Sequence, residues 1–165
     1  MGDTTIRELV YGKGAHVDPM ACVEDISANL AVRAVAGYPH SIWQIVEHMN
    51  YWMEYEVRRG DGYAANYPEH AIESWPPHPD PAGEMQWSAT RQRFSDLLAR
   101  LAVLAEADTT VFNRAVAPDK PNLPPSTVGA VVKQIMAHNS YHVGQIAMLR
   151  RQFDAWPPLR GGDSW

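Results

Sequence analysis

The chain has 165 residues, 45% of them hydrophobic and 20% charged, which is the composition of an ordinary globular protein with one core. A formal net charge of −5 disfavours nucleic-acid binding, because phosphate backbones select a basic face. The longest unbroken apolar run, Leu101–Ala105, is far below the ~20 residues that a membrane span needs. Cys22 is the single cysteine, so an internal disulfide is excluded. We expect one cytoplasmic domain over residues 1–165, with neither a nucleic-acid nor a membrane partner.

Short helical stretches separated by turns fill the first forty residues. An amphipathic stretch covers Thr4–Tyr11, a second candidate helix covers about 16–26, and an alanine-rich third covers 27–35. The turn Gly37-Tyr38-Pro39 closes this section. The pattern predicts short N-terminal helices.

A capping-box pattern opens the next element, since Ser41 and Gln44 can each bond the other's backbone N–H. Arg58 and Arg59 suit the negative end of a helix dipole, and Gly60 can supply a left-handed terminating residue. Apolar side chains recur at three- and four-residue steps at Ile42, Ile45, Val46, Met49 and Met53. We therefore predict a helix from Ser41 to about Arg59.

Proline-rich connections separate the remaining elements. The segment 61–83 contains five prolines, and its aromatic residues favour an ordered cover rather than a disordered loop. A helix is predicted over 84–107, no helix is possible over 117–125 with its four prolines, and Ser126 or Thr127 caps a last helix that ends near Phe153.

These elements predict an all-α fold, a four-helix bundle with short N-terminal helices and a long connection between the second and third bundle helices. No stretch alternates with period two, so no strand is expected. The long connection leaves the topology open, because it can cross over or return.

Two histidines, His138 and His142, stand four residues apart in the last predicted helix. At this spacing side chains lie on one face about 6 Å apart, so both imidazoles can reach one point. Together with Gln145 they fall near the apolar stripe that Val131 and Ile135 define, and they point inward. An inward pair can bind a metal, or each ring can bond a carbonyl or hydroxyl group.

A third ligand is available in His48, at the flank of the apolar arc of the Ser41 helix. Three imidazoles from two helices form an open set whose fourth position is left to water or substrate, as in catalytic zinc sites. No Glu lies between His138 and His142, so the HExxH arrangement of metallopeptidases is absent. Glu47 points about 100° away from His48 and is a poor general base.

The whole pattern resembles the DinB/YfiT-like superfamily. The similarity rests on the stretch 40–52 (HSIWQIVEHMNYW), the Trp75-Pro76-Pro77 loop, the helix start at Glu84–Trp87 and the stretch 138–145 (HNSYHVGQ). It implies a four-helix bundle, often a homodimer, in which three histidines bind a divalent metal such as Zn, Ni, Fe or Mn. Carried over to this chain, the ligands are His48, His138 and His142.

Characterised relatives in this superfamily include transferases and isomerases that depend on a low-molecular-weight thiol. The resemblance therefore implies that the metal lowers the thiol pKa for attack on a small electrophilic substrate. Gln145 is the candidate catalytic residue that orients a ligand, and Trp52 and Tyr55 either wall the pocket or pack the core. The alternative is a non-enzymatic, stress-related metal-binding bundle with a structural ion.

Other polar residues are assigned no chemistry. His16, His40, His70 and His78 stand in predicted turns or loops, where solvated or capping side chains are the expectation. Arg150 and Arg151 are expected to be solvated at the end of the last helix. Since protonated imidazole cannot ligate, metal affinity is expected to fall below about pH 6.5.

Overall fold

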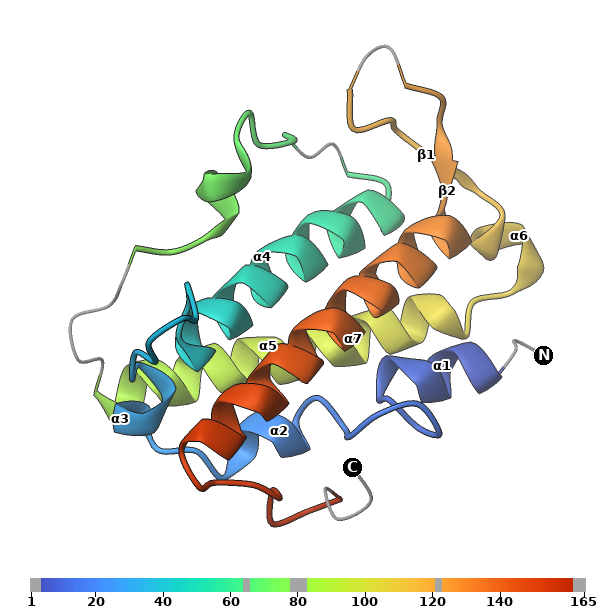
Figure 1. Ribbon diagram of the computed structural model, residues 1–165. Helices are drawn as coiled ribbons and strands as arrows, with labels where there is room; N and C mark the ends of the chain where they lie inside the picture. The colour runs from blue at the N-terminus through green and yellow to red at the C-terminus, as the bar shows by residue number, and fades with distance from the viewer. Residues whose placement is uncertain (1–3, 64–65, 78–82, 121–122, 162–165) are drawn as a thin grey trace.

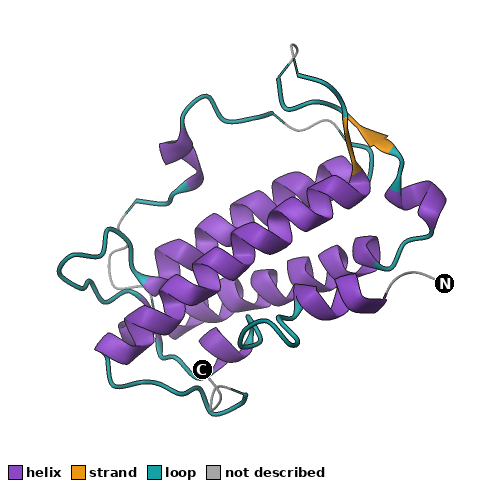
Figure 2. Cartoon of the chain, turned by 45° about the vertical axis from the view of Figure 1, so that its right-hand side comes forward, coloured by secondary structure: helices purple, strands orange, loops and turns teal. Residues whose placement is uncertain are grey.

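Three long helices lie side by side in the computed structural model, which describes residues 4–63, 66–77, 83–120 and 123–161 (Figure 1). They are α4 (Ile42–Gly60), α5 (Glu84–Ala105) and α7 (Val128–Gln152), and each packs against the other two. The helix α1 (Thr4–Val10) packs on α5 and α7, which completes a bundle (Figures 1 and 2). The prediction of an all-α fold is confirmed.

Short elements connect the long helices. The N-terminal section adds α2 (Ala21–Glu24) and α3 (Ala28–Ala31), and a 3₁₀ turn, η1 (Ala71–Ser74), interrupts the connection between α4 and α5. The single-turn helix α6 (Thr109–Phe112) follows α5 and was not expected, because the sequence around it lacks a sustained period. Among the described residues, no helix is both long and apolar enough to cross a membrane.

The helices α4 and α5 run parallel, which settles the topology that the sequence leaves open. Near their N-terminal ends Trp43 donates from Nε1 to Oγ1 of Thr90 at 3.2 Å, and at the other end Asp61 pairs with Arg100. A parallel pair cannot be joined by a short turn. The connection after α4 therefore crosses back along the bundle before α5 begins, as its path in Figure 1 shows.

The predicted starts of the three long helices are confirmed, whereas the helices predicted over 16–26 and 27–35 are shorter in the structure and form only α2 and α3, of four residues each. The predicted end of the Ser41 helix is shifted. Ser41 Oγ accepts from the N–H of Gln44 at 3.3 Å, and Gln44 Oε1 accepts from the N–H of Ser41 at 3.0 Å. The left-handed residue after α4 is Gly62 (φ +93°), not Gly60. Gly60 instead lets Leu104 approach, because a Cβ there would lie 2.8 Å from Leu104 Cδ1.

A two-residue antiparallel pair, β1 (Ala115–Val116) with β2 (Ser126–Thr127), brackets the proline-rich connection. It contradicts the expectation of no strand, because two residues are too short to produce a period-two pattern. The pair fixes the start of α7, where Oγ1 of Thr127 accepts from the N–H of Ala130 at 3.2 Å.

Arg150 at the end of α7 is buried, so the expectation of a solvated side chain is wrong for this residue. Its side chain is 2% exposed and pairs with Asp25 at 2.6 Å. It also donates to the carbonyl oxygens of Cys22 and Ala155, each at 2.8 Å. The last turn of α7 packs against the α2 segment. The Arg150 guanidinium thus connects α7 to the segment 22–25 and to Ala155.

Candidate metal centre

Three histidine side chains meet between α4 and α7. His48 comes from the middle of α4, while His138 and His142 come from the α7 face that packs on it. The Nε2 atom of His138 lies 3.2 Å from Nε2 of His48 and 3.1 Å from Nε2 of His142. In the described part of the chain, this is the one group of three or more His, Cys, Asp or Glu side chains whose ligand atoms all lie within 4.8 Å of one another.

Burial keeps these imidazoles neutral. His48 is 6% exposed and His142 is 4% exposed. Burial, together with the neighbouring histidines, lowers the pKa of His48 to about 3 and that of His142 to about 4. Burial also lowers the pKa of His138. Neutral imidazole is the form that carries a free lone pair for a metal.

Hydrogen bonds at the outer nitrogens decide where the ring protons lie. Nδ1 of His48 lies 3.2 Å from the carbonyl oxygen of Ser74 and 3.1 Å from its Oγ. The Ser74 hydroxyl proton goes to the carbonyl oxygen of Ala71 at 2.7 Å, so Nδ1 of His48 is the donor to Ser74. Nδ1 of His142 donates to Oε1 of Gln145 at 2.6 Å. Each neutral ring has one N–H, so Nε2 of both rings is a bare acceptor.

The donor set fits a divalent metal ion. Two bare Nε2 acceptors face Nε2 of His138, whose single proton cannot fully satisfy both, while Nδ1 of His138 is buried without a partner. A cation between the rings satisfies three lone pairs at once. Three neutral nitrogens without a carboxylate suit zinc, nickel or iron.

Residues of the α4–α5 crossover cover the histidines. The Trp75 ring is stacked between His40 and His48, with centroids 3.7 Å from each and interplanar angles of 10° and 8°. Nε2 of Gln44 donates to the carbonyl oxygen of Pro76 at 3.1 Å, which holds the segment onto α4. Within the described part of the crossover, Trp75 thus covers His48.

Comparison with known proteins identifies the family. The DinB superfamily matches residues 20–146, a range that contains all three histidines. The chain belongs to the DinB superfamily. No curated protein and no solved structure matches the chain.

Within this DinB superfamily chain, the other predicted site residues surround the histidines at different distances. Gln145 contacts the outer nitrogen of His142 and donates from Nε2 to the Tyr141 hydroxyl at 3.3 Å. The Trp52 ring lies edge-on to His48 at 6.5 Å. Tyr55 lies beyond Trp52 and donates to Asp119 at 2.9 Å. Their roles toward a substrate stay predictions.

Two further histidines take part in the packing around this DinB centre. His40 is half-buried on Trp75, so the expectation of a solvated or capping side chain is wrong there. The same expectation is wrong for His16, which is half-buried and connects the N-terminal section to α7, with Nε2 2.8 Å from Oγ of Ser140. His70 is exposed at the start of η1, and His78 lies outside the described residues.

Glu47 faces away from the histidines, as the helix geometry predicts. Its carboxylate accepts from the Thr90 hydroxyl at 2.6 Å and pairs with Arg93 at 3.1 Å. The carboxylate adjacent to a proposed ligand in sequence is therefore engaged by α5. Sequence reasoning missed Ser74, because nothing local marks a carbonyl that reaches His48 only through the crossover.

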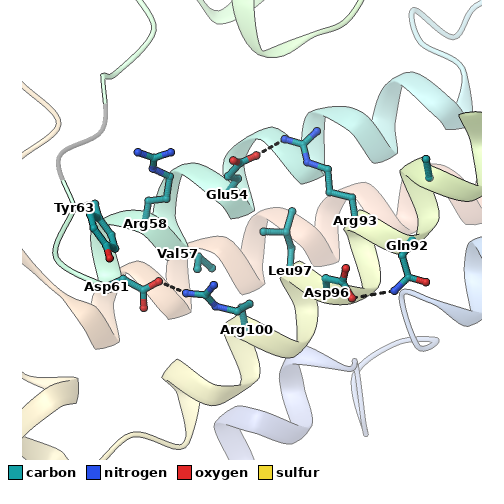
Figure 3. A pocket seen from close by; sticks show the side chains of 11 residues that line it. Glu54, Val57, Arg58, Asp61, Tyr63, Gln92, Arg93, Asp96, Leu97 and Arg100 are labelled. Carbon is teal, nitrogen blue, oxygen red and sulfur yellow. Dashed lines mark hydrogen bonds and ion pairs between the residues drawn. The ribbon is translucent and has the colours of Figure 1, made fainter.

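A groove on the outer face of α4 and α5 contains none of the three histidines (Figure 3). Its volume is about 1110 Å³, with Val57 and Leu97 among the residues that line it. The charges in it are largely paired with one another, Arg93 with Glu54 and Arg100 with Asp61. We assign no chemistry to this groove.

Proposed function

We propose that this chain is a metal-dependent enzyme in which His48, His138 and His142 hold a divalent ion and a low-molecular-weight thiol attacks a small electrophile. The observation that carries the proposal is the convergence of three Nε2 atoms, two of them bare acceptors, with no carboxylate in the group. DinB superfamily membership supports it.

The ion and the side chains have different roles in the proposed reaction. When bound, a divalent ion with three neutral ligands keeps its full charge and lowers the pKa of a thiol or water in its remaining position. Ser74 and Gln145 fix the orientation of two ligating rings, and Trp75 shields His48 from water. In the transfer itself, the sulfur forms a bond to the electrophilic carbon, the leaving group departs with its electron pair, and the thiol proton passes to solvent.

The test starts from protein purified without a histidine tag and analysed for bound metal. We expect about one ion per chain, and thiol-dependent loss of an activated aryl halide that chelation abolishes and metal restores. His142→Ala should lose both the metal and the activity. Metal content unchanged in His142→Ala would refute the site.

A structural ion is the competing function, and the burial of His48 and His142 under Trp75 favours it. It predicts that chelation lowers the melting temperature while azide and thiols never reach the ion. Metal-loaded protein that is inactive across several thiols and electrophiles, with an ion closed to azide, would favour this function over the enzyme.

A further inference from the structure

Asn139 lies in the buried stripe of α7 directly after His138 and is 3% exposed. Within the described residues, neither its amide nitrogen nor its amide oxygen has a hydrogen-bond partner. A buried amide without partners destabilises a fold, because it has lost its bonds to water without replacement. Asn139 therefore has unused hydrogen-bonding capacity inside the bundle.

The imidazole ring of His138, the residue before Asn139, also has a polar atom without a hydrogen-bond partner. Nδ1 of His138 is buried without a partner, whereas Nδ1 of His48 contacts Ser74 and Nδ1 of His142 contacts Gln145. The unpartnered amide of Asn139 and the unpartnered Nδ1 of His138 therefore belong to adjacent residues of α7, although no hydrogen bond joins them.

We propose that Asn139 is the positioning residue of His138, whose Nδ1–H donates to the Asn139 amide oxygen when Nε2 ligates a metal. The inference rests on the proposed metal centre. Ligation through Nε2 leaves the ring's one proton on Nδ1, and a buried N–H needs an acceptor. With Asn139 in this role, each of the three ligating rings has an outer partner supplied by the chain.

The test measures cobalt affinity and apoprotein stability side by side. Asn139→Leu keeps a similar side-chain volume and removes both polar atoms. We expect it to bind cobalt about 10- to 100-fold more weakly. The apoprotein should be at least as stable in urea as the wild type, because two unpartnered polar atoms are gone. Asn139→Asp keeps an acceptor oxygen and should restore the cobalt affinity.

Asn50→Leu is the matched control. Asn50 is fully buried on α4, and its Nδ2 donates to the carbonyl oxygen of Thr90 at 3.2 Å, while its Oδ1 has no partner among the described residues. This variant should lose apoprotein stability and keep the wild-type cobalt affinity, the opposite of Asn139→Leu.

The outcomes separate this inference from the proposed function. Unchanged cobalt affinity in Asn139→Leu, beside a wild type that binds, overturns the role of Asn139 and leaves the metal centre intact. A wild type that binds no cobalt overturns both. If Asn139→Leu does not fold, Asn139→Ala in the same titration decides the question.

Discussion

Gln145 acts on the centre through a single hydrogen bond, from Nδ1 of His142 to its side-chain oxygen at 2.6 Å. Outer partners of ligating histidines fix the ring tautomer, and their loss typically costs 10- to 100-fold in metal affinity. We expect Gln145→Leu to weaken zinc binding by about that factor in competition with a chromophoric chelator, and Gln145→Glu to retain it. The exposed Gln134→Leu on the same helix is the control. Equal affinities in all four proteins would show that Gln145 does not orient the ring.

Arg150 carries the largest stability effect that we expect from one residue away from the centre. Arg150→Met would leave the Asp25 carboxylate and the carbonyl oxygens of Cys22 and Ala155 without this donor, and leaving such acceptors unpartnered costs about 1–3 kcal/mol. Arg150→Met should lower the free energy of unfolding in urea by that amount, whereas the exposed Arg58→Met should change it by less than about 0.5 kcal/mol. A loss as small as that of Arg58→Met would mean that Asp25 and the two carbonyls do not depend on Arg150.

At the scale of elements, the crossover between α4 and α5 is part of the centre. Trp75 stacks on two histidines, and such pairs contribute about 0.5–1.5 kcal/mol each beyond the area they bury. Trp75→Ala should lower the unfolding free energy by at least one such contribution, and a chelator should capture the metal faster because His48 loses its cover.

Ile72→Ala serves as the control for that experiment, since Ile72 lies on the 3₁₀ turn η1 just before Trp75 and is 68% exposed. It should match the wild type in both measurements. Metal release from Trp75→Ala at the wild-type rate would show that the crossover does not hold the ligand in place.

The elements also explain what the sequence could predict. The spacing of His138 and His142 places both rings on one face of any helix, and the Ser41–Gln44 box needs only local geometry. Ser74 reaches His48, and Trp75 reaches His40, only because α4 and α5 are parallel and the connection crosses back, which no local pattern encodes. The partners of Arg150 could not be predicted either, because the Cys22 carbonyl lies more than a hundred residues earlier in the chain.

For the whole molecule, the buried histidines predict how apoprotein stability depends on pH. Folding lowers the pKa of His48 to about 3 and that of His142 to about 4. Below about pH 6.5 these histidines are therefore protonated in the unfolded chain while they stay neutral in the folded protein. The contribution of these histidines to the free energy of unfolding thus falls as the pH drops from 6.5 toward 4. Glu56, whose pKa burial raises to about 7, contributes with the opposite sign.

Comparison with His142→Asn isolates the histidine contribution. The variant should lose less urea stability than the wild type between pH 6.5 and pH 4, because one depressed pKa is gone. If the unfolding free energies of the variant and the wild type change in parallel with pH, His142 does not have a lowered pKa in the folded protein. In the folded protein, protons should compete with metal at a lower pH than the value of about 6.5 that the sequence suggested, because burial lowers the pKa of all three ligands.

Membership of the DinB superfamily and the all-α bundle follow from local motifs and were predictable. A single domain, a homodimer, a cytoplasmic location and a small-molecule partner stay predictions, because nothing in one folded chain reports on a second copy or on a compartment. The thiol and the electrophile likewise depend on contacts that form only when they bind.

Cobalt substitution tests the central claim most directly. Cobalt-loaded wild type titrated with a low-molecular-weight thiol should develop a thiolate-to-cobalt charge-transfer band that saturates, and His142→Ala treated identically should show none. A cobalt spectrum that no thiol alters, in protein with a full metal load, would contradict thiol activation at the three-histidine centre.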